Sequence, residues 1–261
     1  MSAPRALLLD ALGTLLELEP PVEPLRRELR ERCGIDVTAE EAAAALRAEI
    51  AFYRANHDDA SDRERLADLR RRATEALRDA LVTSREGGPL ARAGARKLAE
   101  VPLATLTEVL LAALRFRPFA EVPEVLRAAR EQGIRLVVVS NWDVSLHDVL
   151  ADTRLAPLLD GVVTSAEVGS AKPDSAIFAR GLAIAGVAAG EALHVGDSVE
   201  HDVAGARAAG IAAVLVARNG DDDRLGARLQ WPHGRFRPPS PLPGDVPAIP
   251  SLRPLLRMLS A

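Results

Sequence analysis

Asp10 is the residue of this chain with the clearest capacity for chemistry. It follows the apolar run Ala6–Leu9 and precedes a turn that contains Gly13. A carboxylate at the carboxyl end of a buried strand stands where open α/β sheets present their catalytic groups. From there an aspartate can attack an electrophile and form a covalent intermediate, which divides one difficult displacement into two easier ones. We therefore interpret Asp10 as a candidate nucleophile.

Three further polar fragments follow Asp10 along the chain, and two of them also come directly after apolar runs. Judged singly, each has a plain structural explanation, because an aspartate after a strand is often a helix N-cap and a polar pair is often an ordinary turn. The ordered set favours a shared site at one edge of a sheet. The fragments are Ser140-Asn141, Lys172-Pro173-Asp174 and Gly196-Asp197-Ser198, with Asp202 five residues after Asp197.

The residue types in these fragments suit phosphoryl chemistry. Lys172 is one of only two lysines in the chain, and a fixed cation lets an anionic nucleophile approach an anionic phosphoryl group. The hydroxyl of Ser140 and the backbone N–H groups near Asn141 can hold phosphate oxygens. Carboxylates from two strand ends, Asp10 and Asp197, suit a hard cation such as Mg²⁺, which pairs one or two carboxylates with substrate phosphate.

The ordered set resembles the motifs of the haloacid dehalogenase (HAD) superfamily of aspartate-nucleophile hydrolases, over most of residues 5–217. This resemblance implies a hydrolase in which Asp10 attacks phosphorus to give an aspartyl-phosphate. Lys172 would be the second catalytic residue. The resemblance also implies a small phosphorylated metabolite as the substrate, bound beneath a helical cap that is inserted after the first strand.

The resemblance assigns phosphate binding to Ser140, Asn141 and Thr14. We expect the Thr14 hydroxyl to orient the turn through a hydrogen bond to the backbone.

In the family that the chain resembles, Mg²⁺ is held by the nucleophile, by the first acid of the last motif and by a backbone carbonyl two residues after the nucleophile. Here these positions are Asp10, Asp197 and the carbonyl of Leu12. Asp202 is expected to orient Lys172 or a metal-bound water, the plain alternative being a helix N-cap.

Leu12 departs from the pattern of that family. The first motif usually reads D-x-D-G-T, whereas this chain has Asp10-Ala11-Leu12-Gly13-Thr14. The second Asp is the usual general acid and base, and its loss should slow reactions with poor leaving groups about 10²–10⁴-fold. The substitution should leave the main-chain metal ligand intact. We therefore expect acyl or aryl phosphates as substrates, or an acid recruited from the cap.

Three functions remain open on this evidence, in decreasing order of preference. The first is a Mg²⁺-dependent phosphatase. The second is a 2-haloacid dehalogenase, because such enzymes also lack the second Asp and release halide without a proton, although they need no metal. The third is a catalytically weak binding or regulatory protein that keeps the fold. Four histidines are further acid–base candidates: His57, His147, His194 and His201. None of them has a spacing from Asp10 that indicates a replacement for the missing acid.

The elements that must position these residues alternate between strands and helices. Such alternation predicts βαβ units and a parallel sheet, hence a Rossmann-like core of three layers, α/β/α. Expected strands are 5–10, 134–140, 161–164, 192–196 and 211–217, and expected helices are 121–132, 143–151, 174–185 and 199–209.

Residues 17–116 break this alternation and predict an all-α cap of four or five helices. Ser61 to Glu64 has the pattern of a capping box that opens a helix to about Leu81. Leu66, Leu69, Ala73 and Leu77 would lie on its buried face. The domains expected are therefore a core of residues 1–16 and 117–261, and the cap between them. Within the core, about 229–250 is a proline-rich extension, followed by a short closing helix over 251–259.

Composition limits the remaining function classes. The chain has 261 residues and a formal net charge of −4, which gives no reason to expect nucleic acid as a partner. No stretch of about 18 apolar residues is present, so we expect no membrane span. The chain has a single cysteine, Cys33, and its first residues lack the features of a secretory leader. Both observations fit a cytoplasmic protein, which we expect to be a monomer or a homodimer.

Overall fold

The computed structural model describes residues 3–84, 89–218 and 246–259. Its main sheet has six parallel strands in the order β5-β4-β1-β6-β7-β8. The strands are β1 (Ala6–Leu9), β4 (Arg135–Ser140), β5 (Gly161–Thr164), β6 (Ala192–Gly196), β7 (Ala212–Val216) and β8 (Ala248–Ile249). The first five match the predicted strands, and the two-residue β8 was not predicted.

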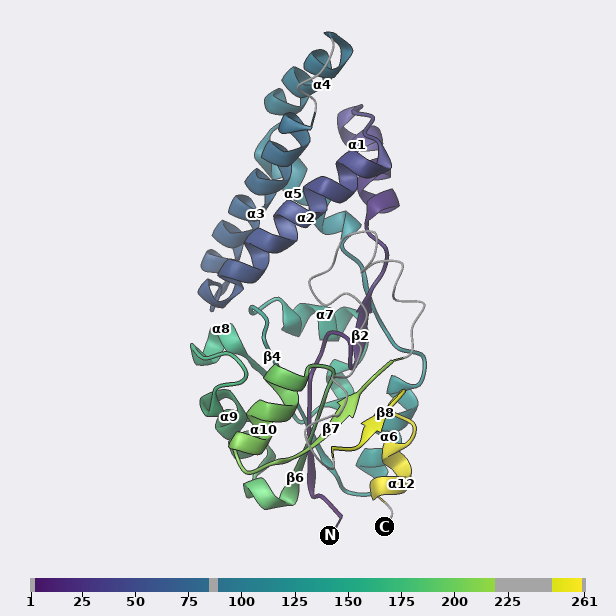
Figure 1. Cartoon of the computed structure of the whole chain (residues 1–261), viewed down its shortest axis with the longest axis vertical. Helices are drawn as coiled ribbons and strands as arrows, with labels where there is room; N and C mark the ends of the chain where they lie inside the picture. The colour runs from purple at the N-terminus through teal and green to yellow at the C-terminus, as the bar shows by residue number, and fades with distance from the viewer. Residues whose placement is uncertain (1–2, 85–88, 219–245, 260–261) are drawn as a thin grey trace.

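Helices cover both faces of this sheet. They are α6 (Val122–Glu131), α7 (Leu146–Asp152), α8 (Ser165–Val168), α9 (Ser175–Ala185), α10 (Gly205–Ala208) and α12 (Leu255–Leu259), with the 3₁₀ turns η2 (Ala156–Leu158) and η3 (Ala189–Glu191). Helices α6 and α12 lie on one face of the sheet, and α9 and α10 lie on the other (Figure 1). Leu7 and Leu9 of β1 pack on the first face, and Ala6 and Leu8 pack on the second. Because both faces are covered, β1 is buried along its whole length. The predicted three-layer α/β fold is thereby confirmed.

The predicted helix over 199–209 is wrong in its first half. The chain there forms a π-helical segment, η4 (Val199–Ala204), before α10 begins. The carbonyl of Ser198 accepts hydrogen bonds from the backbone N–H groups of both Asp202 and Val203. Such wide turns are rare and occur often at functional sites, and the apolar spacing of so short a segment does not separate them from an α-helix.

The cap is an all-α insertion that comprises residues 22–113. It contains α1 (Val22–Cys33), α2 (Ala39–Asn56), the 3₁₀ turn η1 (His57–Asp59), α3 (Arg63–Thr83), α4 (Pro89–Glu100) and α5 (Leu103–Ala113). The cap has an apolar core of its own. Figure 1 shows it as a layer beyond the carboxyl ends of the sheet strands. The prediction of four or five helices in this region is confirmed.

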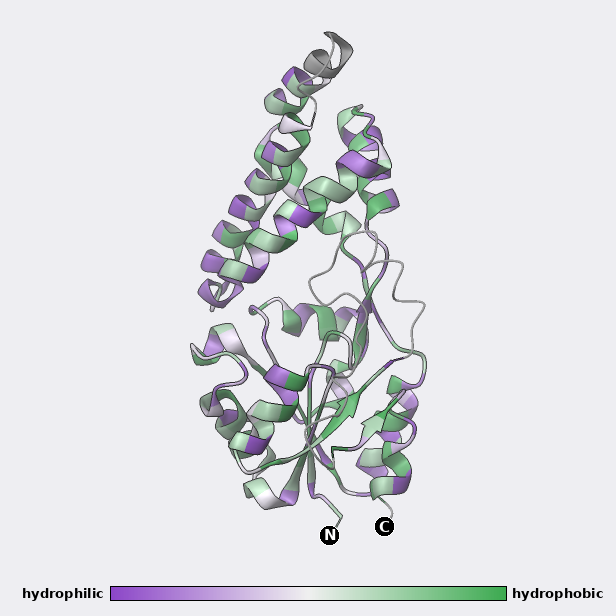
Figure 2. Cartoon of the chain, viewed as in Figure 1, coloured by the Kyte–Doolittle hydropathy of each residue, from purple (hydrophilic) through white to green (hydrophobic). Residues whose placement is uncertain are grey.

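Helix α3 has the predicted buried face, with Leu66, Leu69, Ala73 and Leu77 all buried. Figure 2 shows hydrophobic and hydrophilic residues alternating along it. The helix begins at Arg63, one residue later than the expected capping box implies. Its N-cap is Asp62, whose side chain accepts a hydrogen bond from the backbone N–H of Arg65, the third helical residue. The helix ends at Thr83.

A small antiparallel ribbon joins the cap to the core. Its strands are β2 (Leu16–Leu18) and β3 (Phe116–Pro118). The expected domain boundaries at 16/17 and 116/117 pass through this ribbon and remain a proposal. Three-residue strands carry too little pattern to be predicted, and their pairing depends on residues about 100 positions apart in the chain.

The C-terminal part of the chain is described only from residue 246 onward. Most of the expected proline-rich extension therefore lies outside the described residues. The closing helix is present as α12, and its Leu255 and Leu259 are buried. Within the described ranges, no helix combines the length and apolarity needed to cross a bilayer.

Candidate active site

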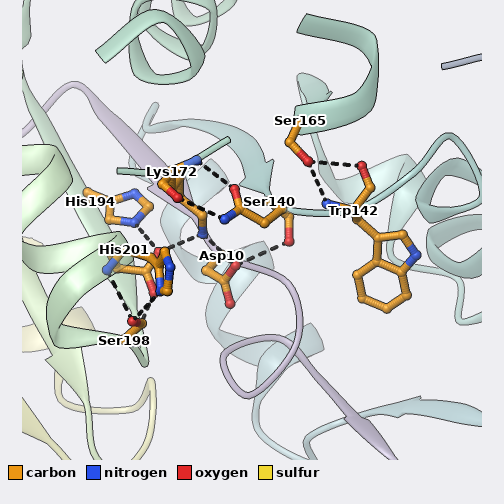
Figure 3. A network of polar contacts seen from close by, with 10 residues as sticks. Asp10, Ser140, Trp142, Ser165, Lys172, His194, Ser198 and His201 are labelled. Atoms are coloured by element: carbon orange, nitrogen blue, oxygen red, sulfur yellow. Dashed lines mark hydrogen bonds and ion pairs between the residues drawn. The ribbon is translucent and has the colours of Figure 1, made fainter. Parts of the chain in front are cut away.

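The carboxyl ends of three neighbouring strands meet at the candidate site. Asp10 follows β1, Ser140 ends β4 and Asp197 follows β6, and β1 lies between the other two strands. Lys172 reaches the same place from the loop between α8 and α9. Figure 3 shows Ser140 and Lys172 directed at Asp10. All four sequence fragments are therefore brought to one edge of the sheet.

Lys172 is held between two carboxylates. Its Nζ lies 2.6 Å from Oδ1 of Asp10 and 2.5 Å from Oδ1 of Asp202. The side chain is only 2% exposed. Burial by itself disfavours the ammonium form, but the charges of the two aspartates outweigh it and raise the pKa of Lys172 above its usual range. The ammonium is therefore a fixed cation beside Asp10, the predicted nucleophile.

Asn141 fixes the backbone of Lys172. Its Nδ2 donates to the Lys172 carbonyl at 3.0 Å, and its Oδ1 accepts from the Lys172 N–H at 2.7 Å. Both ends of the amide are thus engaged with the lysine loop. The side chain is therefore used to fix the lysine loop, and the expected phosphate contact through backbone N–H groups near Asn141 stays a prediction.

Ser140 and Thr14 are both buried hydroxyl residues of the site. The Ser140 hydroxyl donates to Oδ1 of Asp10 at 3.2 Å, and its contact with phosphate stays a prediction. The Thr14 hydroxyl is also buried but has no hydrogen-bond partner among the described residues. The expected hydroxyl-to-backbone bond is therefore wrong. The turn is closed instead by backbone bonds to the Ala11 carbonyl.

Asp202 accepts a hydrogen bond from Lys172 and so helps to orient it, which is one of the two roles expected for this residue. Its Oδ1 also accepts from Nε2 of the buried His194 at 2.9 Å, and its Oδ2 accepts from the Ser198 backbone at 2.9 Å. Burial opposes ionisation, but the Lys172 charge and the His194 hydrogen bond prevail and lower the pKa of Asp202 below its usual range. The alternative role as N-cap is excluded, because Ser198 caps η4.

Asp197 completes an acidic cluster with Asp10 and Asp202, in which one oxygen of each lies within 4.8 Å of the others. Burial raises the pKa of Asp197 well above its usual range, and the charges of the other two aspartates add to this. Burial likewise raises the pKa of Asp10, although Lys172 opposes it. The cluster therefore has more negative charge than one ammonium offsets, a condition that a hard divalent cation relieves.

The donor set fits the expected metal. Both oxygens of Asp202 are occupied by hydrogen bonds, whereas Oδ2 of Asp10 makes none within the described part of the chain. Asp10 and Asp197 are therefore the carboxylates that would hold Mg²⁺. Gly13 allows their approach, since a Cβ there would lie 2.1 Å from Oδ2 of Asp197.

Sequence reasoning missed Arg218, which holds the turn after β1. Its guanidinium donates to the carbonyls of Gly13 at 3.1 Å and Thr14 at 2.7 Å, pairs with Glu121 at 2.7 Å and lies over the Phe119 ring at 3.4 Å. Its position just after β7, at the same sheet edge, was the one available signal.

The cap contacts the core beside the Ser140 loop. Tyr53 donates to Asp143 at 2.8 Å, and the Ala60 carbonyl accepts from the Val144 backbone at 3.2 Å. Further polar contacts are Ser165 with Asp58 at 2.5 Å and Arg63 with Asp148 at 2.8 Å. These contacts were not predicted, because the sequence around one partner gives no indication of the other, which is distant in the chain.

Each of the four candidate histidines contacts a residue other than Asp10, and that none of them replaces the missing acid stays a prediction. His147 contacts Glu167, His201 contacts Ser198 and His57 contacts Asp58. His194 contacts Asp202, and its Nδ1 has no hydrogen-bond partner among the described residues.

Comparison with known proteins agrees with this geometry. The family model for haloacid dehalogenase-like hydrolases matches residues 4–210. The haloacid dehalogenase-like hydrolase domain-containing protein 3 of Bos taurus is 44% identical over 92 residues, which are 35% of this chain and 37% of the bovine protein. A phosphoserine phosphatase of Thermus thermophilus is 39% identical over 105 residues, 40% of this chain and 42% of that protein. These matches therefore span well under half of either relative.

The structure of L-2-haloacid dehalogenase from Xanthobacter autotrophicus matches this fold with a TM-score of 0.66 at 19% identity, covering 99% of each chain. A HAD phosphatase from Thermococcus onnurineus matches with a TM-score of 0.53 at 22% identity, covering 98% of this chain and 97% of the other. Sequence identities this low support only a shared fold. The family match over most of the chain, on an aspartate–lysine site of this geometry, shows that the chain belongs to the haloacid dehalogenase-like hydrolases.

Proposed function

We propose that this hydrolase is a Mg²⁺-dependent phosphatase that acts on a small phosphorylated substrate through an aspartyl-phosphate. The observation that carries the proposal is the buried Asp10–Lys172–Asp202 array, with Asp197 beside it. An anionic nucleophile meets an anionic phosphoryl group only where fixed positive charge offsets their repulsion. Relatives named phosphoserine phosphatase and phosphoglycolate phosphatase support the same reaction class.

In the first step a carboxylate oxygen of Asp10 forms a bond to phosphorus, and the bond from phosphorus to the leaving oxygen breaks. The leaving oxygen takes the bonding electron pair and then a proton. In the second step water attacks phosphorus, phosphate departs and the Asp10 carboxylate is restored. Lys172 and the Ser140 hydroxyl hold the phosphoryl oxygens during both steps.

Asp10, Asp197 and the Leu12 carbonyl would hold the Mg²⁺ ion. When bound, it supplies positive charge against the phosphoryl oxygens, in addition to that of Lys172. The carbonyl is main chain, so the Leu12 side chain does not affect this role.

Leu12 restricts the substrates. Its side chain cannot donate a proton and packs against the apolar core instead. The first step is therefore fastest for leaving groups that depart unprotonated, which acyl and aryl phosphates provide.

A 2-haloacid dehalogenase is the second candidate, because Leu12 fits a leaving halide that needs no proton. The raised pKa of Asp197 in a crowded acidic cluster argues for a metal instead. A catalytically weak binding protein is the third.

One panel of assays separates the three. The purified chain is given 4-nitrophenyl phosphate, acetyl phosphate and 2-chloropropionate, each with Mg²⁺ and with a chelator. We expect Mg²⁺-dependent phosphate release that Asp10→Asn abolishes. Halide release in the presence of chelator would replace the phosphatase by the dehalogenase. No turnover of any substrate would leave the weak binding protein.

A further inference from the structure

His194 is a polar residue in an apolar layer of the core. It lies in the middle of β6 and is fully buried. Its partners in register on the neighbouring strands are Leu8 and Ala213, and both belong to the apolar cluster on the side of α9 and α10. The Phe178 ring of α9 is nearly perpendicular to the imidazole, with the two ring centroids 5.1 Å apart. A position with such surroundings is usually filled by an apolar side chain.

The imidazole makes its hydrogen bond to Asp202. Its Nε2 lies 2.9 Å from Oδ1 of that residue. Because an ionised carboxylate only accepts hydrogen bonds, the imidazole must donate through Nε2. Its Nδ1 is buried with no hydrogen-bond partner among the described residues, and burying such an atom costs stability. An apolar residue would therefore serve the core better, and the hydrogen bond to Asp202 is what the histidine adds.

Strand β6 also gives Asp202 the space that it needs. Residues two apart in a strand lie on the same face, so Gly196 and His194 face the same layer. A Cβ on Gly196 would lie 2.2 Å from Cγ of Asp202. Gly196 therefore lets the carboxylate approach the strand, and His194 supplies the donor beside it. Two independent features of one strand thus fit the same carboxylate.

The oxygen that His194 binds is the one that holds Lys172. Oδ1 of Asp202 accepts from Nε2 of His194 and from Nζ of Lys172, which is 2.5 Å away. Its Oδ2 accepts from the Ser198 backbone. Three donors from different segments therefore fix the orientation of this carboxylate. Without the His194 donor the carboxylate is freer to rotate, and the ammonium of Lys172 moves with it relative to Asp10.

We propose that His194 is a positioning residue that fixes Lys172 against Asp10 by way of Asp202. The inference rests on the proposed phosphatase function and adds to it a residue that acts from inside the core. What matters in this role is a donor at the place of Nε2, and the volume of the side chain alone does not supply it.

The ammonium of Lys172 is accessible to direct measurement, because Lys97 is the only other lysine of the chain. The full chain is labelled with ¹⁵N in its lysine side chains. The exchange of the ammonium protons with water is then measured by NMR in the presence of Mg²⁺, and Lys97→Arg assigns the two signals. Hydrolysis of 4-nitrophenyl phosphate is assayed on the same samples, and urea unfolding verifies that each variant is folded.

Three variants of His194 separate the donor from the volume. The amide nitrogen of His194→Gln reaches about the place of Nε2, whereas the amide of His194→Asn ends one bond short of it. His194→Leu fills the space without a donor. His201→Leu is the matched control, because His201 is the residue before Asp202 and its ring contacts Ser198 instead.

We expect His194→Gln to keep the slow exchange of the Lys172 ammonium and most of the turnover. His194→Leu and His194→Asn should exchange faster and have a kcat about 10- to 100-fold lower, the effect of losing one hydrogen bond to a charged group. His201→Leu should match the wild type in both measurements. A role in packing alone predicts the opposite order, with His194→Leu at or above His194→Gln. If His194→Leu does not fold, the comparison of Gln with Asn decides.

Unchanged exchange and turnover in His194→Leu and His194→Asn would overturn the inference. Equal losses in His194→Gln would also overturn it, and so would faster exchange without any loss in kcat. If the wild type hydrolyses no phosphate ester while the ammonium responds as expected, the proposed function falls and the positioning of Lys172 stands. If hydrolysis proceeds and the ammonium does not respond, the positioning role alone falls.

Discussion

Lys172 Nζ lies 2.6 Å from Oδ1 of the buried Asp10, and the same nitrogen lies 2.5 Å from Oδ1 of the buried Asp202. Such a contact requires a compact ammonium. The planar guanidinium of arginine is larger and would have to displace one aspartate.

We therefore expect Lys172→Arg to lower kcat for an aryl phosphate about 10²–10³-fold, the usual loss when one fixed transition-state charge is misplaced. Steady-state assays with Mg²⁺ measure it. Lys97→Arg is the control, since Lys97 contacts only the Gly34 carbonyl on the cap surface among its described contacts. Normal turnover by Lys172→Arg would remove Lys172 from the mechanism.

Leu12→Asp should restore the missing proton donor. We expect alkyl phosphate turnover to rise about 10²-fold or more and aryl turnover much less, because protonation matters chiefly for a strongly basic leaving oxygen. Asparagine has nearly the same shape as aspartate but cannot transfer the proton, so Leu12→Asn should show no gain in alkyl phosphate turnover. If Leu12→Asp changes neither substrate, another residue already supplies the proton or the protein is not a phosphatase.

The wild type should also accumulate the aspartyl-phosphate, because no carboxylate at position 12 is available as the base that takes a proton from the attacking water. Release of 4-nitrophenol in a burst, followed by slow turnover, is the expected kinetic mark. Rapid-quench measurement checks it, and Leu12→Asp should reduce the burst. A linear time course for both proteins would contradict this.

Mg²⁺ binding should depend on Asp197. Calorimetric titration should detect binding to the wild type and none to Asp197→Asn, which lacks one of the two carboxylates left for the metal. Glu200→Gln is the control, because it removes an exposed carboxylate of η4 only three residues away. Equal affinity in wild type and Asp197→Asn would show that the metal ligand is misplaced.

Glu49 of α2 should make the free energy of unfolding fall as the pH rises. Its side chain is buried, and burial raises its pKa from 4.5 to about 8. Between these two values the folded state keeps a proton that the unfolded chain has released, so stability falls as pH rises through this window and levels off above about 8. The loss is at most about 5 kcal/mol at 1.36 kcal/mol per pKa unit.

Glu49→Gln should therefore stabilise the protein progressively more from pH 5 to pH 8, as measured by urea unfolding at each pH. Glu28→Gln is a suitable control, because Glu28 is paired with Arg32 at 2.9 Å and its removal should destabilise instead. A pH-independent effect of Glu49→Gln would show that Glu49 is ionised in the folded state.

Arg218 holds the nucleophile turn, so its loss should affect both stability and activity. Arg218→Met leaves Glu121 buried without its partner, and we expect a loss of about 3–5 kcal/mol in the free energy of unfolding. Adding Glu121→Leu should recover stability but not kcat, because the Gly13 and Thr14 carbonyls remain unheld. Full recovery of kcat in the double variant would limit Arg218 to a stabilising role.

The sequence by itself determined the parallel core, its first five strands, the helical insertion and the residues that gather at the sheet edge. The reason is local. A strand buried on both faces is a short apolar run, and polar residues that end such runs in a parallel sheet must share one edge. Asp10, Ser140 and Asp197 were found in this way.

Tertiary structure alone decided how those residues are used. The engagement of Asn141 with Lys172, the unbonded Thr14 hydroxyl and the π-helical η4 depend on packing that no local pattern records. Arg218 contacts Gly13 across 205 residues of chain, and Tyr53 of α2 contacts Asp143 only because the cap is placed against the loop after β4. Such pairings follow from the path of the chain in space, since each partner taken singly is an ordinary polar residue at the end of an element.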